Sequence, residues 1–69
     1  MFIREAIQED YESVKASCLK MREDKNMCGF SRVNFIDYTP VLGTLREEFP
    51  ELEFVQKSYG LTVDKKEAQ

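Results

Sequence analysis

The strongest constraint on the fold is a helical apolar stripe in the first third of the chain. Its residues recur at spacings of four, three, four and three, and they are Ile7, Tyr11, Val14, Cys18 and Met21. That periodicity predicts an amphipathic helix from Ile7 to about Asp24, with Leu19 widening the apolar face. Acidic residues gather in its first turns and basic residues in its last, an arrangement that suits the helix dipole.

A second helix is predicted from residues that favour a helix start and a helix end. Thr39 is a suitable N-cap, Pro40 a suitable first helical residue, and Pro50 a stop. Gly43 weakens a helix interior by about 1 kcal/mol relative to alanine, and we expect close packing against the first helix to compensate. The predicted apolar face consists of Val41, Leu42, Leu45 and Phe49.

Strands are predicted at both ends of the chain. Phe2–Ala6 reads as a short first strand, and Leu52–Ser58 with Leu61–Asp64 reads as an antiparallel hairpin that turns at Tyr59-Gly60. We therefore expect one α+β domain over residues 1–64, with the order β-α-α-β-β and two helices packed on a short antiparallel sheet. Residues 65–69 form a polar tail, which we expect to be frayed.

Between the predicted helices the pattern is weaker. Residues 24–31 read as a loop because Asn26 and Gly29 supply turn chemistry and no apolar period survives. Residues 32–36 suit either a short strand or an extended connection. A chain of 69 residues holds one small core, which folds alone only marginally and often gains support from self-association.

Several kinds of chemistry are excluded by residue type. The 69 residues include no histidine, so neither a Cys–His metal site nor a nucleophile with a histidine base can form. Cys18 and Cys28 stand too far apart for a zinc knuckle or a thioredoxin-type pair, and they predict two free thiols, with a disulfide left open. Adjacent carboxylates point away from each other on a helix, and the tyrosines suit structural roles. We predict no catalytic residue, metal or cofactor.

Charge is unevenly distributed around a net value of −3. A basic segment at 15–32 lies between acidic segments at 1–12 and 37–53, a weaker basic face than nucleic-acid binders usually carry. A winged-helix alternative would use Thr39–Phe49 for recognition, but Glu47 and Glu48 would repel a phosphate backbone. No signal peptide or apolar run of about 20 residues is present, so we expect a cytoplasmic protein without a membrane segment.

Two segments resemble the GNAT family of N-acetyltransferases. The opening Phe2–Asp10 is similar to that family's first strand, an Ile-Arg-x-Ala segment followed by an acidic helix start. Phe30–Phe35, followed by a helix with Leu42 and Leu45, is similar to the link between the family's first two helices. The resemblance covers about residues 2–64 and implies the N-terminal half of that fold.

The same resemblance argues against acetyl transfer. Family members bind acetyl coenzyme A through a later Gly-rich loop whose amides meet the pyrophosphate at a helix N-terminus. Here Gly29, Gly43 and Gly60 are each isolated. The resemblance therefore implies a half-domain without the cofactor site, and an acyltransferase would need a partner chain.

Apolar residues around the central loop point to protein binding. Together with nearby basic residues they form the predicted interface: Arg22, Lys25, Met27, Phe30, Arg32 and Phe35. A half-domain would also leave sheet edges open for self-association or for strands of a partner. We thus predict a non-catalytic protein-binding module, a small regulatory or inhibitory factor of the kind that phages and mobile elements encode, with homo-oligomerisation as a further expectation.

Overall fold

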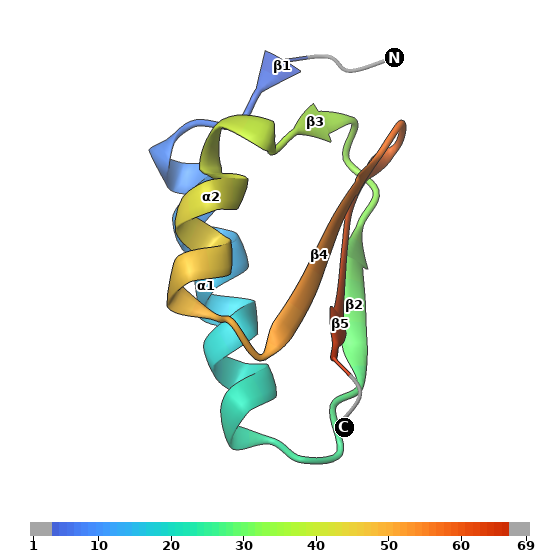
Figure 1. The fold of residues 1–69 in the computed structure, drawn as a ribbon. Helices are drawn as coiled ribbons and strands as arrows, with labels where there is room; N and C mark the ends of the chain where they lie inside the picture. The colour runs from blue at the N-terminus through green and yellow to red at the C-terminus, as the bar shows by residue number, and fades with distance from the viewer. Residues whose placement is uncertain (1–3, 67–69) are drawn as a thin grey trace.

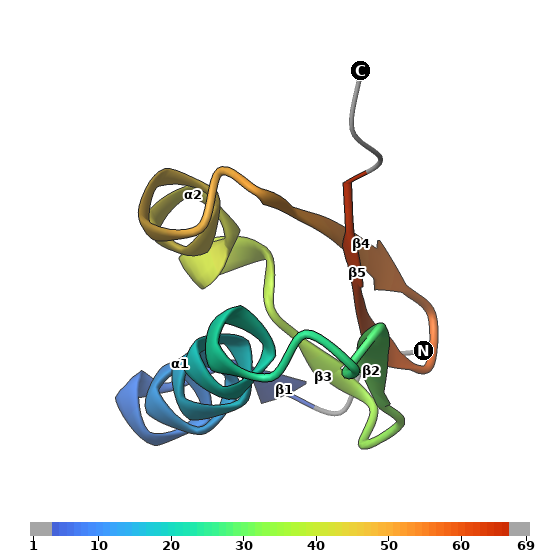
Figure 2. The ribbon, with the colours of Figure 1, turned by 90° about the horizontal axis from the view of Figure 1, so that it is seen from below.

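Two helices cover one face of a three-stranded antiparallel sheet in the computed structural model, which describes residues 4–66 (Figures 1 and 2). The predicted α+β class, with two helices on a short antiparallel sheet, is confirmed. Two short strands that the predicted order omits lie between the helices. The elements are β1 (Arg4–Glu5), α1 (Gln8–Glu23), β2 (Gly29–Arg32), β3 (Ile36–Asp37), α2 (Thr39–Glu48), β4 (Leu52–Lys57) and β5 (Gly60–Lys65).

The central strand of the sheet is β5, which comes after the other strands in the sequence. The strand order is β2-β5-β4, and Val63 of β5 lies opposite Phe30 on one side and Phe54 on the other. A separate parallel pair joins β1 to β3, with Arg4 opposite Ile36. The side chains of Phe30, Val63 and Phe54 therefore lie side by side across three strands and form part of one apolar layer.

The first helix buries most of its predicted stripe. Val14, Cys18 and Met21 are almost completely buried, and Tyr11 packs half-buried against them. Ile7 is 56% exposed because it lies before the first helical residue, so its predicted place in the core is wrong. Leu19 is also exposed and does not widen the buried face.

The second helix begins at Thr39, one residue earlier than the predicted start at Pro40. Tyr38 is its N-cap, and Thr39 is already helical because the Asp37 Oδ1 accepts hydrogen bonds from the Thr39 N–H (3.0 Å) and Oγ1 (2.6 Å). A methyl group added at Gly43 would meet no atom within 4 Å, so the expected packing against α1 is wrong. The predicted apolar face is confirmed for Leu42, Leu45 and Phe49.

The hairpin forms where it is predicted, but its turn is Ser58-Tyr59 rather than Tyr59-Gly60. Gly60 is the first residue of β5, with φ +145°, and a Cβ there would lie 1.7 Å from the Arg32 carbonyl oxygen. Glycine is therefore required at this strand position for close approach of β2 as well as for backbone conformation.

The ends of the domain also differ from the prediction. Lys65 belongs to β5, and the Lys66 N–H donates to the Glu51 carbonyl (3.1 Å), so these two residues of the predicted tail join the fold. Residues 67–69, and Phe2 and Ile3 of the predicted first strand, lie outside the described residues.

The predicted loop at 24–31 contains three of the four residues of β2. Gly29–Arg32 forms β2 because it pairs with β5, a partner distant in the sequence that no local pattern reveals. Gly29 fits there because a Cβ would lie 2.5 Å from the Val63 carbonyl oxygen. Of residues 32–36, only the two ends are in strands, and Val33–Phe35 connects them.

Candidate protein-interaction site

The predicted interface residues do not gather on one surface. Phe30 and Arg32 lie together on β2, where the Arg32 guanidinium carbon is 5.6 Å from the centroid of the Phe30 ring. The Arg32 Nη2 also donates to the Ser13 carbonyl (3.1 Å) and the Ser17 Oγ (2.7 Å) of α1. Arg32 therefore ties the sheet to the first helix.

Arg22 makes a different link, from α1 to the end of α2. Its Nε and Nη2 donate to the two Glu51 carboxylate oxygens at 2.7 and 3.1 Å, and Nη2 also donates to the Glu48 carbonyl at 3.0 Å. The guanidinium carbon lies 4.7 Å from the centroid of the Phe49 ring. The hydrogen bond from Arg22 lowers the pKa of Glu51. These contacts give Arg22 a structural role within the fold, although its side chain stays 47% exposed.

Lys25 and Met27 lie in the connection between α1 and β2. Lys25 is exposed, and its carbonyl accepts a hydrogen bond from the Lys65 Nζ (3.3 Å). Met27 is half-buried against the core, and its N–H donates to the Asp24 carbonyl (3.1 Å). Met27 and Phe30 thus serve partly as packing residues.

Phe35 stands apart, at the opposite end of β2, in the segment Val33–Phe35, which we name the Phe35 loop. Its side chain is 43% exposed and that of Val33 is 62% exposed. Phe35 has φ +55°, the left-handed region that residues other than glycine, asparagine and aspartate rarely adopt. Backbone strain of this kind costs about 1–3 kcal/mol and concentrates at functional sites.

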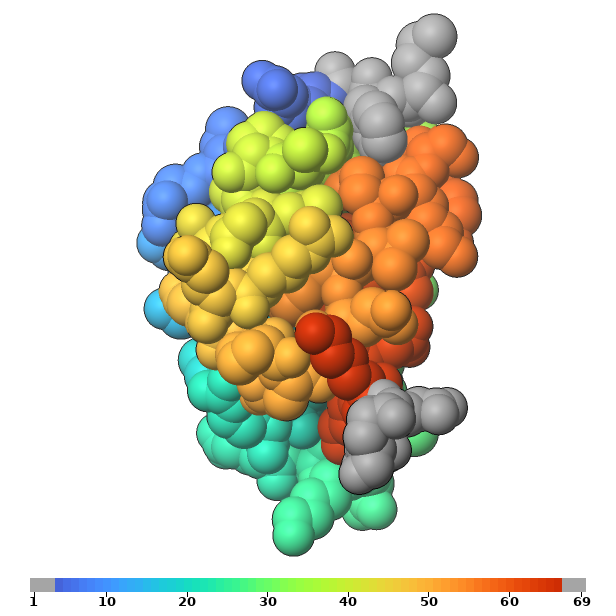
Figure 3. All heavy atoms as spheres, in the orientation of Figure 1, coloured from blue at the N-terminus to red at the C-terminus, as the bar shows by residue number. Residues whose placement is uncertain are grey.

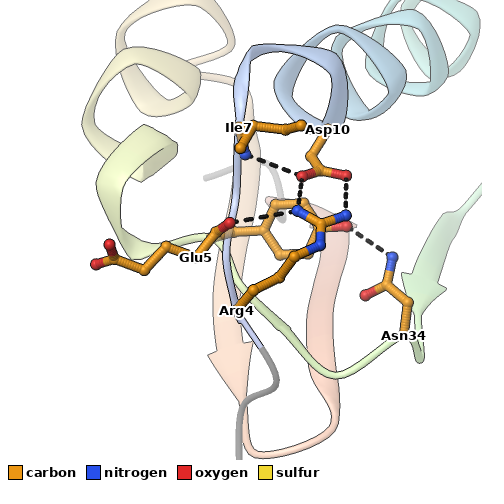
Figure 4. Close-up of polar contacts among 6 residues, drawn as sticks. Arg4, Glu5, Ile7, Asp10 and Asn34 are labelled. Carbon is orange, nitrogen blue, oxygen red and sulfur yellow. Dashed lines mark hydrogen bonds and ion pairs between the residues drawn. The ribbon is translucent and has the colours of Figure 1, made fainter.

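The Phe35 loop is held from both sides. The Phe35 N–H donates to the Tyr59 carbonyl in the hairpin turn (3.0 Å), and the Asn34 Nδ2 donates to the hydroxyl of buried Tyr38 (2.8 Å; Figure 4). The polar side chain at the centre of the loop is therefore anchored on the domain, while the apolar side chains on either side of it are exposed.

A salt bridge supports the pair of strands β1 and β3, of which β3 directly follows this loop. The Arg4 Nη1 and Nη2 donate to the two Asp10 carboxylate oxygens at 2.6 and 3.2 Å, and the Asp10 Oδ2 accepts the Ile7 N–H at 2.9 Å (Figure 4). The hydrogen bond from Arg4 lowers the pKa of Asp10. Since β1 pairs with β3, this contact links the Phe35 loop to the start of α1.

Gln56 makes a set of contacts that sequence reasoning missed. Its Oε1 accepts the Tyr38 N–H (2.8 Å), and its Nε2 donates to the carbonyls of Ile36 (3.1 Å), Gly60 (2.9 Å) and Lys57 (2.9 Å). It joins β3 and the start of α2 to the hairpin. The available signal was its place two residues after buried Phe54, an inward position on β4 occupied by a polar side chain.

The two edges of the three-stranded sheet are unequal. On β4, the Phe54 carbonyl accepts from the Arg46 Nη2 (3.1 Å) and the Leu52 N–H donates to the Phe49 carbonyl (3.0 Å). Within residues 4–66, no backbone hydrogen bond joins the far side of β2, which we name the β2 edge, to another element. The β2 edge and the Phe35 loop are contiguous and form the candidate site.

Other site types find little support in the described part of the chain. No group of three or more Cys, Asp or Glu residues there could hold a metal ion. Cys18 and Cys28 are free, and burial raises the pKa of the Cys18 thiol to about 11. Neither described helix is long and apolar enough to cross a membrane.

Comparisons with protein-family models, with curated proteins and with solved structures gave no significant match. The resemblance to N-acetyltransferases therefore stays a prediction.

Proposed function

We propose that this protein is a non-catalytic binding module, a small regulatory or inhibitory factor that takes an extended segment of a partner protein along the β2 edge. The carrying observation is Phe35, held at φ +55° with 43% of its side chain exposed beside that edge. A fold that keeps an aromatic residue in an unfavourable backbone conformation and in contact with water has not placed it there for packing.

Strand addition suits the chemistry of the β2 edge. Alternate residues of an antiparallel edge strand direct both their N–H and C=O groups outward, where a partner strand can pair with them. Phe30 and Arg32 of β2 lie on the helix side, so the other face of the strand carries only Ser31 and Gly29, which has no side chain. Neither residue would obstruct a neighbouring strand. The backbone would supply affinity, and the Phe35 loop would supply an apolar anchor at the end of the added strand.

The anchored loop would also reduce the cost of binding. Ordering a flexible loop on association costs free energy, and a loop already fixed by hydrogen bonds avoids most of that cost. The bonds from Phe35 to Tyr59 and from Asn34 to Tyr38 fix this one in the free protein. Phe35 therefore has the character of a preorganised hot-spot residue.

The test uses the Phe35→Asn variant, because asparagine tolerates the left-handed backbone and removes the aromatic ring. Proteins captured from a cell extract by the wild-type chain are purified and titrated into the isotope-labelled chain, with amide shifts followed by NMR. We expect shifts at residues 29–35 and a loss of affinity of about tenfold or more in the variant.

The matched control is Glu53→Gln on the β4 edge, which should bind as the wild type does. Thermal unfolding checks that both variants fold. Unchanged affinity in the Phe35 variant, or shifts confined to the helices or to β4, would rule out the proposal.

A further inference from the structure

The outer face of β4 carries an unbalanced charge pattern. Glu53, Val55 and Lys57 alternate with inward residues, and Val55 is 40% exposed. Glu53 lies directly opposite Asp64 of β5, whereas Lys57 lies opposite Gly60. Among residues 4–66, the ion pairs include neither Glu53 nor Lys57.

Two carboxylates directly opposite each other on neighbouring strands destabilise a sheet. A cation on the other side of Glu53 would offset this repulsion. Arg46 is the nearest basic side chain of α2, and it donates to the Phe54 carbonyl instead. Lys66 borders the same hollow as Glu53, but within residues 4–66 no ion pair joins the two. Glu53 can therefore accept a further cation from outside the sheet, at the β4 edge.

The β4 backbone is oriented to pair with another strand. The contacts of the Phe54 carbonyl and the Leu52 N–H show that these residues direct their backbone groups away from β5. Because the direction of the backbone N–H and C=O groups alternates along a strand, those of Gln56 also point away from β5, whereas those of Val55 point toward it. A hollow of about 260 Å³ lies along this edge, where Figure 3 shows β4 in orange at the surface beside α2 in yellow.

We propose that β4 pairs antiparallel with β4 of a second copy of this chain, about a twofold axis at Val55. The sequence Glu-Phe-Val-Gln-Lys at 53–57 is antisymmetric in charge about its centre. In this register Glu53 of each copy lies opposite Lys57 of the other, and the two exposed Val55 side chains meet. Each Glu53 gains a cation on the side away from Asp64.

The backbone satisfies the same register. Phe54 of one copy and Gln56 of the other exchange hydrogen bonds on both sides of the axis. The Phe54 carbonyl can accept from both Gln56 of the second copy and its own Arg46, because a carbonyl oxygen has two lone pairs. The result is a six-stranded sheet with a β2 edge at each end, so self-association does not depend on the proposed partner binding and does not compete with it.

Sedimentation analysis over a range of concentrations tests the pairing. We expect a dimer for the wild-type chain and a monomer for Val55→Lys, which places two cations at the axis. Lys57→Glu should raise the dimer dissociation constant about tenfold, and adding Glu53→Lys to it should restore most of the affinity by exchanging the charges. Circular dichroism checks that each variant folds.

Crosslinking locates the axis independently. Val55→Cys in a Cys28→Ser background should form a covalent dimer under mild oxidation, since facing Cα atoms in a non-hydrogen-bonded antiparallel pair lie about 4.5 Å apart. Ser31→Cys in the same background, on β2, should not crosslink. A wild-type chain that stays monomeric at millimolar concentration, a dimer insensitive to Val55→Lys, or crosslinking through Ser31→Cys alone would overturn the proposal.

Discussion

The two edges of the three-stranded sheet, β4 and β2, both have backbone groups that pair with no strand, but they differ in the side chains beside those groups. At the β4 edge, Arg46 and Phe49 contact backbone groups of Phe54 and Leu52, and the outer side chains of Glu53 and Lys57 are charged. At the β2 edge, the strand is short, its outer side chains are small, and an anchored apolar loop follows it. Charges and covering groups usually limit which strands can pair with a sheet edge. β4 carries both and so suits only a strand of complementary charge, whereas the outer face of β2 carries neither.

The predicted interface residues likewise divide into residues that bind the chain itself and one that is exposed beside the β2 edge. The arginines that sequence reasoning assigned to an interface, Arg22 and Arg32, bind the chain's own carbonyls and carboxylates. Phe35 makes its backbone contact and remains 43% exposed. For a chain of this size, an exposed apolar side chain is therefore a better guide to a binding surface than an arginine that binds the chain itself.

The largest expected effect comes from Gly60→Ala, which disturbs both edges through the central strand. The added Cβ meets the Arg32 carbonyl oxygen of β2 at 1.7 Å, in a backbone conformation that alanine avoids. We expect a loss of about 3 kcal/mol or more in the free energy of unfolding, measured by urea denaturation. Gly43→Ala is the control: it should raise stability by up to about 1 kcal/mol, because its surroundings are open. Equal effects at the two glycines would contradict this account.

A smaller loss is expected on the β4 side from Gln56→Ala. The substitution leaves the Tyr38 N–H and the Ile36 carbonyl without their partner, which costs about 2 kcal/mol. Thermal unfolding measures the loss. Glu53→Gln, an outward neighbour on the same strand, should change stability by no more than about 0.5 kcal/mol. If the two variants melted alike, Gln56 would not be joining β3 to the hairpin.

Asn34→Ala acts only on the loop beside the β2 edge. Losing the bond to the Tyr38 hydroxyl should lower stability by about 1 kcal/mol. The sharper readout is hydrogen exchange: the Phe35 amide should exchange faster, while amides of β4 keep their protection. Uniform loss of protection over both edges would show that the loop is not a separate unit.

The smallest effect is expected from acid. The hydrogen bond from Arg4 lowers the pKa of Asp10, and hydrogen bonds from Thr39 lower that of Asp37, each from 3.8. A carboxyl whose folded pKa is lowered stabilises the fold above its unfolded pKa, and this contribution is lost as pH falls through the folded value. Thermal stability should therefore decline below about pH 4, beginning near β1 and β3.

The Asp10→Asn variant separates this contribution, because it should be less stable at neutral pH and show a shallower decline in acid. The bond from Arg46 to the Phe54 carbonyl involves no carboxyl group, so we expect the amide of Phe54 to respond after that of Ala6. NMR shifts of the Ala6 and Phe54 amides against pH would compare the two regions, and simultaneous change at both would contradict the prediction.

The sequence predicted correctly the elements that depend on short-range features, such as apolar periodicity and proline or glycine positions. The stripe at Val14, Cys18 and Met21, the stop at Pro50 and the final hairpin follow from periodicity and from residues with restricted backbones. These features depend on contacts within one element or between neighbours in the chain.

The candidate site depends on contacts that no local pattern encodes. Strand β2 exists because β5 pairs with it, and the Phe35 backbone conformation exists because Tyr59 and Tyr38 hold the loop on either side. Gln56 reads as an ordinary strand residue until its partners on β3 and α2 are known. Phe35 could be predicted as an interface residue from its apolar character, but its exposure and strain could not.

The place of β5 in the sheet has a consequence for biosynthesis. Both ladders of the three-stranded sheet run through this strand, from Phe30 to Val63 and from Phe54 to Val63. Neither can form while residues 60–65 are still inside the ribosome, so the helices emerge with their apolar faces uncovered. Formation of the sheet must bring β2 to a strand about 30 residues further along the chain, and such non-local closure is slow. Folding of this sequence should therefore be slower than its small size alone suggests.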